Sequence, residues 1–247
     1  LVTHLPAPDD PEGLARICRG ALVRLSPGTP VEVGWRWRPH EDWSHLWKRG
    51  LGVREITPHL FVAPSWEAFS PDPGQILITL DPGMAFGTAE HATTRCCLRA
   101  LEGRGPSGAR LADVGAGSGI LSIAAARMGA REVMAFEMDE VSCETAEANL
   151  VRNGAEGVVR VLRTRVEGPG PLPGAPFHGV MANLQSRILA SLLPAFASSL
   201  KPGGWLIMSG VLREEKDEVL TAAGSGWRFL QAEEEDGWWT GVLTLDG

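Results

Sequence analysis

Residues Leu111 to Met128, with the sequence LADVGAGSGILSIAAARM, decide how the rest of the chain is arranged. They predict a short buried strand over Arg110 to Val114, a turn rich in glycine, and a helix whose small and aliphatic side chains can lie flat on a sheet. The glycines of the turn are Gly115, Gly117 and Gly119. Glycine permits a tight turn and lets a ligand approach the main-chain N–H groups at the start of a helix. The stretch is therefore a candidate cofactor-binding loop.

The spacing of these glycines narrows the class of cofactor. A dinucleotide fingerprint needs a third glycine at its sixth position, where this chain has Ile120, and no Gly-Lys-Ser/Thr follows as in a P-loop. An acid at the end of the next strand can accept hydrogen bonds from both hydroxyls of a ribose. Glu137 ends the apolar run 133–136 and lies 22 positions after Gly115, as one strand–helix–strand unit requires. The loop and the acid together favour a ligand that contains a ribose.

Two more carboxylates lie near this loop in the sequence. Asp113 comes just before the turn and belongs to the same sheet edge, whereas Asp139 is expected to be solvated. Glycine turns also occur in α/β proteins for packing alone. That structural reading stays the alternative to a cofactor site.

Beyond the loop, predicted strands alternate with segments of helical periodicity. Parallel strands joined by helices, with an antiparallel hairpin at one edge, predict an α/β fold with a doubly wound, mostly parallel, seven-stranded sheet. Ligands of such sheets bind outside the carboxyl ends of the strands, where Gly115, Glu137 and Asn183 would gather. The strands are expected at 60–63, 75–80, 157–162, 177–182 and 205–209, the helices at 92–101, 141–153, 187–200 and 212–223, and the hairpin at 227–233 with 238–245.

The N-terminal part reads as a separate, small α+β unit. Residues 11–25 have helical periodicity with Asp10 as N-cap, and residues 31–37 alternate like a half-buried strand. Residues 40–49 predict a linker helix with Trp43 and Trp47 on one face, either for packing or as a patch that contacts a partner. We therefore expect a substrate-recognition domain over 1–39, a linker over 40–58 and a catalytic domain over 59–247.

The composition is that of a soluble globular protein, with 44% hydrophobic and 21% charged residues among 247. No apolar run reaches the length of a membrane helix, and the first residues lack the pattern of a signal peptide, so a cytoplasmic location is expected. The four cysteines have neither metal-ligand spacing nor a disulfide framework, and buried reduced thiols are expected. A net charge of −7 argues against unspecific binding to nucleic acid and is compatible with a basic protein substrate.

Several motifs occur in the order in which one enzyme family has them. The glycine pattern D-x-G-x-G-x-G with its downstream acid resembles the Rossmann-like methyltransferases that use S-adenosylmethionine (SAM). The motifs are WSHLWKR (43–49), FVAPSWE (61–67), DPGMAFGT (81–88), HATT (91–94), DVGAGSGIL (113–121), EANLVRNG (147–154), MANL (181–184) and LKPGGWLIMSG (200–210). The whole set resembles the PrmA family, which methylates the large-subunit ribosomal protein L11.

The resemblance assigns a part of SAM to several residues. It implies that Gly115 and Gly117 approach the amino-acid part, that Glu137, in place of the usual Asp, holds the ribose, and that Thr94 contacts the methionine carboxylate. Asp113 and Asn183 would belong to the same cofactor site. Phe86, Gly87 and Thr88 would form a flap over the methyl end. No metal ligands are expected.

Asn183 and Leu184 are the candidate catalytic residues. Methyl transfer from a sulfonium needs alignment and a neutral amine rather than an acid, and a side-chain carbonyl at the end of the fourth core strand can orient that amine. The alternative is that Asn183 only caps the following helix. In the resembled family this segment is Asn-[Ile/Leu]-x-Ala, whereas here Ser186 replaces the alanine. For His91 we favour a hydrogen bond that orders the loop over a role as general base.

The favoured function is a SAM-dependent protein methyltransferase acting on lysine ε-amino or N-terminal α-amino groups of a ribosomal protein like L11. The substrate would be free or part of the large subunit, and the enzyme a monomer that binds no nucleic acid and no membrane. Ser186 and an N-terminal unit shorter than that of the family keep an alternative open, in which the same fold acts on another protein or on a small-molecule amine. A SAM-binding module without activity is a third possibility.

Overall fold

The computed structural model describes residues 10–25, 28, 30–35, 52–81 and 87–245. The chain divides into two compact units, residues 1–50 and 51–247. The predicted linker helix with Trp43 and Trp47 lies outside the described residues, as does Phe86 of the predicted flap. The narrower boundaries expected from the sequence, at 39 and 58, stay predictions.

The first unit contains helix α1 (Pro11–Leu25), as its periodicity predicts. Asp10 caps this helix, since its Oδ1 accepts the N–H of Gly13 at 2.8 Å. The strand predicted over 31–37 is wrong for its described part, because residues 31–35 form no ladder. An alternating pattern becomes a strand only where a neighbouring strand pairs with it, and residues 31–35 are not part of a β-ladder.

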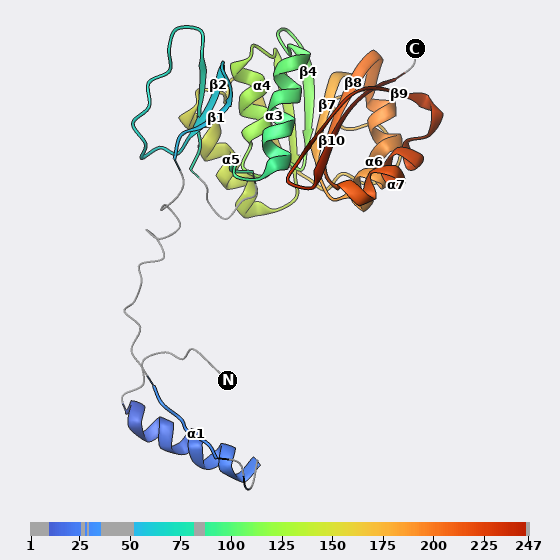
Figure 1. Ribbon diagram of the computed structural model, residues 1–247. Helices are drawn as coiled ribbons and strands as arrows, with labels where there is room; N and C mark the ends of the chain where they lie inside the picture. Colours follow the sequence, from blue (N-terminus) through green and yellow to red (C-terminus); the bar gives the residue numbers. More distant parts are fainter. Residues whose placement is uncertain (1–9, 26–27, 29, 36–51, 82–86, 246–247) are drawn as a thin grey trace. The chain divides into compact units, whose positions relative to one another are not determined.

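The second unit is built on the predicted seven-stranded sheet, with strand order β6-β5-β4-β7-β8-β10-β9 (Figure 1). Strands β4 to β8 run parallel to one another, and β10 pairs antiparallel with both β8 and β9. This arrangement confirms the doubly wound, mostly parallel sheet with a closing hairpin. The strands are β4 (Arg110–Val114), β5 (Glu132–Glu137), β6 (Val159–Arg163), β7 (Phe177–Asn183), β8 (Leu200–Leu212), β9 (Trp227–Glu235) and β10 (Trp238–Leu245).

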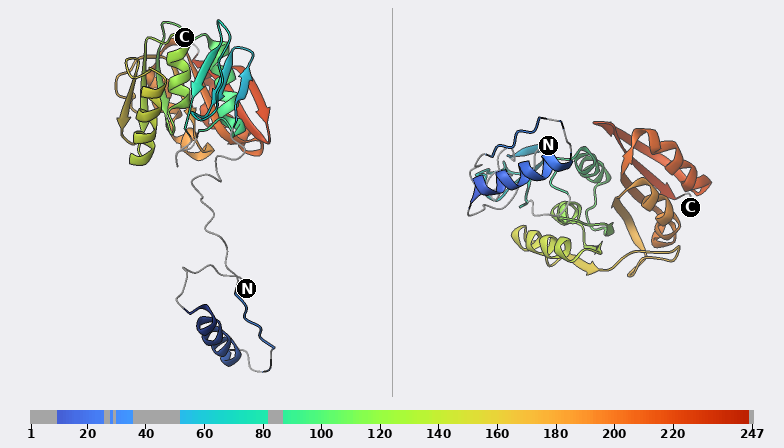
Figure 2. Two further views of the ribbon diagram at one scale, coloured as in Figure 1. Left: turned by 90° about the vertical axis from the view of Figure 1, so that its left-hand side faces the viewer. Right: turned by 90° about the horizontal axis from the view of Figure 1, so that it is seen from below.

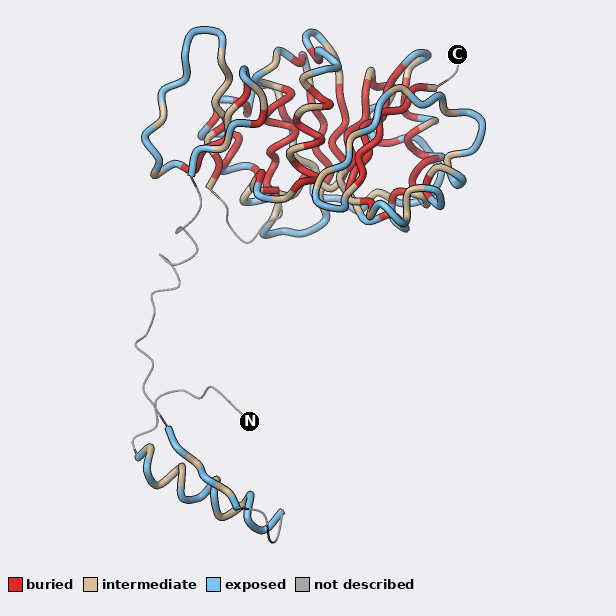
Figure 3. Tube along the Cα trace, viewed as in Figure 1, coloured by how far each residue is buried: buried red, intermediate tan, exposed pale blue. Residues whose placement is uncertain are grey.

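Helices cover both faces of the sheet and enclose two hydrophobic cores (Figure 2). On one face pack Leu98 of α3, Ile123 of α4 and Leu150 of α5, and on the other Phe196 of α6 and Val219 of α7. Figure 3 shows the buried residues concentrated in the strands between these layers. The helices are α3 (Ala92–Arg104), α4 (Ile120–Arg127), α5 (Glu140–Arg152), α6 (Ser186–Ser199) and α7 (Lys216–Ala223).

A second, three-stranded sheet packs against the hydrophobic core on the side of α3, α4 and α5. It consists of β1 (Arg54–Thr57), β2 (Leu60–Ala63) and β3 (Ile76–Thr79), with β2 in the middle. The Asn153 amide, at the end of α5, donates to the Thr79 carbonyl at 2.7 Å and accepts the Thr79 N–H at 2.9 Å. The Thr57 hydroxyl donates to Glu102 of α3 at 2.9 Å. These bonds attach the small sheet to the second unit.

Strand β8 is longer at both ends than its sequence predicts. Leu200 pairs with Phe177 and Trp205 with Gly179, so that residues 201–204 bulge out of the ladder. The Trp205 ring fills the space beside Gly179, where an added Cβ would lie 2.3 Å from the ring. A Lys-Pro-Gly-Gly sequence reads as a turn, and only the pairing with β7 makes it part of a strand. Within the described residues, none of the helices has the length and apolar character that crossing a bilayer requires.

Candidate functional site

The glycine loop after β4 is folded against the end of β5. The N–H groups of Gly115 and Ala116 both donate to the Phe136 carbonyl, at 2.8 and 3.1 Å. Gly115, Gly117 and Gly119 have φ values of 77°, 54° and 81°. A residue with a side chain is strained at such angles, so the backbone itself requires the alternating glycines. Helix α4 begins directly after the loop, which places its first N–H groups at this sheet edge.

Glu137, at the end of β5, is fixed beside the loop as expected. Its Oε2 accepts the N–H of Gly117 at 2.9 Å, and its Oε1 accepts those of Met138 and Asp139 at 2.8 and 3.0 Å. A carboxylate has about four acceptor positions, so these three bonds leave about one position for a further donor such as a hydroxyl group. Asp139 is exposed, as predicted, and caps α5 by accepting the N–H of Ser142 at 2.8 Å.

The Asp113 side chain lies in the protein interior beneath the glycine loop and not on the surface. The Ser122 hydroxyl of α4 donates to its Oδ2 at 2.6 Å. Burial raises the pKa of Asp113 to about 6, although the hydrogen bonds from Ser122 oppose this effect, and the charge of Glu137 adds to it. Two carboxylates therefore lie near the glycine loop, one of them with little solvent around it.

The turn after β7 packs directly on the glycine loop. A Cβ on Gly115 would lie 2.4 Å from Cδ2 of Leu184, so the Leu184 side chain covers that glycine. The Leu184 N–H donates to the Ser209 carbonyl at 3.0 Å, and a Cβ on Gly210 would lie 2.3 Å from the Leu184 carbonyl oxygen. The Asn183–Leu184 backbone is therefore confined between the loop and β8, where only glycines fit.

The start of α3 contributes two buried threonines next to this turn. The Asn183 amide nitrogen donates to Thr93 Oγ1 at 3.2 Å, whereas the Thr94 hydroxyl has no hydrogen-bond partner among the described residues. Both threonines are about 1% exposed. Buried polar groups are almost always hydrogen-bonded. The unpaired Thr94 hydroxyl therefore fits a group of a bound ligand.

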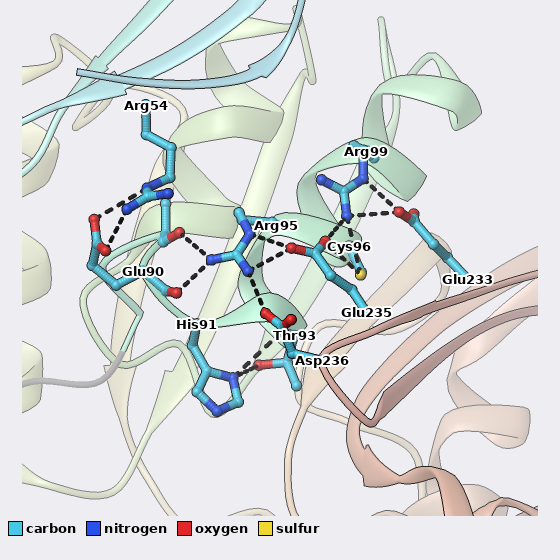
Figure 4. Close-up of polar contacts among 11 residues, drawn as sticks. Arg54, Glu90, His91, Thr93, Arg95, Cys96, Arg99, Glu233, Glu235 and Asp236 are labelled. Carbon is cyan, nitrogen blue, oxygen red and sulfur yellow. Dashed lines mark hydrogen bonds and ion pairs between the residues drawn. The ribbon is translucent and has the colours of Figure 1, made fainter. Parts of the chain in front are cut away.

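His91 is the N-cap of α3 rather than an isolated base. Its Nδ1 accepts the Thr93 N–H at 3.4 Å and lies 2.8 Å from Thr93 Oγ1, as Figure 4 shows. The ring meets that of Trp238 edge to face, with centroids 4.8 Å apart. Burial and the nearby Arg95 lower the pKa of His91, and Asp236 opposes them. These contacts support the loop-ordering role predicted for His91.

The loop before α3 is held from two directions. Within its described part, the Gly87 carbonyl accepts the Ser118 hydroxyl of the glycine loop at 2.5 Å. Arg95 donates to the carbonyls of Ala89 and Glu90. Ala89 has a φ of 62°, an uncommon value for a residue with a side chain. Thr88, next to Gly87, is half-buried.

An ion-pair network, not foreseen from the sequence, joins α3 to the hairpin of β9 and β10 (Figure 4). Arg95 donates to Glu235 at 2.7 Å and to Asp236 at 3.1 Å, and Arg99 donates to Glu233 at 2.7 Å. These partners are 134 to 141 positions apart, and charged residues at such separations carry no local signal in the sequence. The network fixes the hairpin against the helix that starts at the site.

The three cysteines of the second unit are buried and free, as predicted, whereas Cys18 of α1 is free but only partly buried, so the expected burial is wrong for this residue. Cys96 Sγ lies close enough to carboxylate oxygens of Glu233 and Glu235 for the three to meet at a cation. However, the Arg99 guanidinium already donates to Cys96 Sγ at 3.2 Å and to both carboxylates. The side-chain cation occupies the position that a metal ion would take.

The family model described as Ribosomal protein L11 methyltransferase (PrmA) matches residues 18–245. Two relatives, the ribosomal protein L11 methyltransferases of Symbiobacterium thermophilum and Syntrophotalea carbinolica, are each 41% identical. The matches cover 87% and 96% of this chain and 69% and 79% of the relatives.

Solved structures agree with this match. The crystal structure of ribosomal protein L11 methylase from Lactobacillus delbrueckii subsp. bulgaricus superposes with a TM-score of 0.72 at 30% identity, over 79% of this chain and 100% of that one. TrmN from Thermus thermophilus, at 22% identity and a TM-score of 0.51, over 60% of this chain and 48% of that one, shares the fold. The chain therefore belongs to the PrmA family of ribosomal protein L11 methyltransferases and is a SAM-dependent methyltransferase.

Proposed function

We propose that SAM binds at the carboxyl ends of β4, β5 and β7. In this proposal Gly115 and Gly117 border its amino-acid part, Glu137 holds the ribose by accepting a hydroxyl group, and Thr94 donates to the methionine carboxylate of SAM. Support comes above all from the Thr94 hydroxyl, which is buried without a hydrogen-bond partner among the described residues. Gly87 and Thr88, with Phe86, would cover the methyl end, and Asp113 would support the loop from within.

The bound cofactor supplies an electrophilic methyl group on a sulfonium. Asn183 then accepts an N–H of the incoming amine through its carbonyl oxygen and directs the nitrogen lone pair toward the methyl. Leu184 fixes the backbone of this turn by packing on Gly115. A buried position beside an acceptor favours the neutral amine, whose ordinary pKa of about 10.4 for lysine would otherwise keep it protonated.

We infer that the acceptor is a lysine ε-amino or N-terminal α-amino group of ribosomal protein L11, since the relatives bear that name. The net charge of −7 suits a basic substrate. Action in the cytoplasm as a monomer, on L11 alone or in the large subunit, belongs to the same proposal. Ser186, where the resembled family has alanine, favours the second candidate, a different protein or small-molecule amine.

The cofactor placement is tested by replacing Gly117 with arginine. The new side chain would fill the contact space of the loop, so calorimetry should detect no SAM binding while the circular dichroism spectrum stays native. Gly154→Arg is the matched control, because Gly154 is exposed, has open space around it and has a φ of 61°, close to the 54° of Gly117. Near-normal SAM affinity of Gly117→Arg would refute the placement.

The role of Asn183 is tested by Asn183→Ala. We expect kcat to fall about 100-fold, the scale of a misplaced reacting group, with the SAM Kd nearly unchanged. Gln185→Ala, an exposed amide two residues later, is the control. Equal losses in kcat and SAM affinity for Asn183→Ala would assign this residue to the cofactor instead of the amine.

A further inference from the structure

The hydrogen bonds at the start of α3 determine which way the Asn183 amide faces. The Thr93 N–H can only donate, and it points at His91 Nδ1 at 3.4 Å. Nδ1 therefore accepts, and the proton of the neutral ring is on Nε2. Burial favours this neutral ring, because together with Arg95 it lowers the pKa of His91 against the opposing charge of Asp236.

The direction of the next bond follows from this tautomer. Since Nδ1 has no proton, the contact of 2.8 Å between Nδ1 and Thr93 Oγ1 is a bond that the threonine hydroxyl donates. A hydroxyl has one proton, so Oγ1 can only accept from Asn183. The group within 3.2 Å of Oγ1 must then be the amide nitrogen of Asn183 and not its oxygen.

This chain of bonds leaves the Asn183 carbonyl oxygen available as the acceptor. With the amide turned over, two lone pairs would face each other at Oγ1 or the bond to His91 would be lost. Thr93 is buried, so neither arrangement would be relieved by water. The His91 ring is in turn held by its edge contact with Trp238 of the hairpin.

We propose that Thr93 and His91 are positioning residues for methyl transfer, which act through Asn183 by holding its carbonyl oxygen toward the substrate amine. This inference rests on the proposed function, in which Asn183 receives the amine. In this arrangement Thr93 and His91 contact neither SAM nor the substrate amine. They set the fraction of enzyme molecules whose amide faces the right way.

One test needs no substrate. The ¹⁵N chemical shifts of the His91 ring, in protein labelled at histidine and assigned with His91→Asn, report the tautomer at pH 7.5. We expect the Nε2–H tautomer with an unprotonated Nδ1, and a change of the Nδ1 shift in Thr93→Val, which removes the hydroxyl at nearly equal volume. A proton on Nδ1 in the wild-type protein would refute the relay, by which we mean the hydrogen bonds that lead from His91 through Thr93 to Asn183.

The kinetic test uses tritiated SAM and purified ribosomal protein L11 of Symbiobacterium thermophilum. Thr93→Val should lower kcat 10- to 100-fold with a SAM Kd within about threefold of wild type, and Thr93→Ser should restore kcat. His91→Asn keeps an acceptor near the position of Nδ1 and should retain more activity than His91→Ala. Thr94→Val is the adjacent control, for which we expect weaker SAM binding instead.

The double variant separates this inference from the proposed function. In the background of Asn183→Ala, Thr93→Val should lower kcat by less than about threefold further, because the residue it positions is gone. If Asn183→Ala lowers kcat and Thr93→Val does not, the relay is refuted and the proposed function stands. If Asn183→Ala leaves kcat unchanged, the proposed role of Asn183 fails, and so does the relay.

Discussion

Replacing Asp113 by asparagine should change how the stability of the protein depends on pH. The pKa of the buried Asp113 carboxyl is raised from its ordinary value near 3.8 to about 6. The folded protein therefore binds more protons than the unfolded chain between these two values. By linkage, the contribution of Asp113 to the free energy of unfolding falls as the pH rises through this window.

The magnitude follows from the shift. About two pKa units correspond to roughly 3 kcal/mol when the window has been crossed completely. About half a kcal/mol of this is already lost at pH 4, so the change between pH 4 and pH 8 is roughly 2.5 kcal/mol. The asparagine side chain does not titrate. The free energy of unfolding of Asp113→Asn minus that of the wild type should therefore rise by roughly 2.5 kcal/mol between pH 4 and pH 8.

Urea unfolding of both proteins without SAM, at several pH values from 4 to 8, measures this difference. The other ionisable groups are common to both chains, and any constant effect of the asparagine amide on its buried surroundings cancels in the pH dependence. A difference in free energy of unfolding that stays constant within 0.5 kcal/mol, the scale of additivity errors, would refute the buried, ionised carboxylate beside Ser122.

Three further changes test other parts of the second unit. Gly115→Ala, whose Cβ would lie 2.4 Å from Leu184 at a φ of 77°, should destabilise the fold by about 3 kcal/mol in urea unfolding, and a loss below 1 kcal/mol would contradict this geometry. Arg95→Met should lower the free energy of unfolding by about 3 kcal/mol and speed hydrogen exchange over 87–91. The control Arg54→Met, at a half-exposed ion pair, should lower it by less than about 1 kcal/mol, and equal effects of the two changes would argue against the network. Burial raises the pKa of Cys97 above its ordinary range, so its native thiol should resist dithionitrobenzoate at pH 8; labelling as fast as in urea would disprove its burial.

The sequence was most informative where the chemistry is local. The loop at Gly115, the acid at Glu137 and the turn at Asn183 each follow a buried strand, and the rule that ligands bind at carboxyl ends of parallel strands brings them together before any coordinates. The periodicity of α3 to α6 and the closing hairpin were likewise readable, because each segment is long enough for its pattern to repeat.

Interactions between distant segments were not readable. The bond between Asn183 and Thr93 joins residues 90 positions apart, and that between Arg95 and Glu235 joins residues 140 apart. None of these four residues is of an unusual type for its position in the sequence. The extra residues of β8 were also missed, since a strand may include a Lys-Pro-Gly-Gly bulge only when its neighbour supplies the pairing. Conversely, the alternating pattern at 31–35 formed no strand.

Transfer of tritiated methyl from SAM to purified ribosomal protein L11, followed by mass spectrometry of the labelled peptides, tests the central claim most directly. We expect label on lysine side chains or on the N-terminal amine of L11, abolished in Gly117→Arg and reduced about 100-fold in Asn183→Ala. Wild-type protein that binds SAM in calorimetry and leaves L11 without label, both alone and in large subunits, would contradict it.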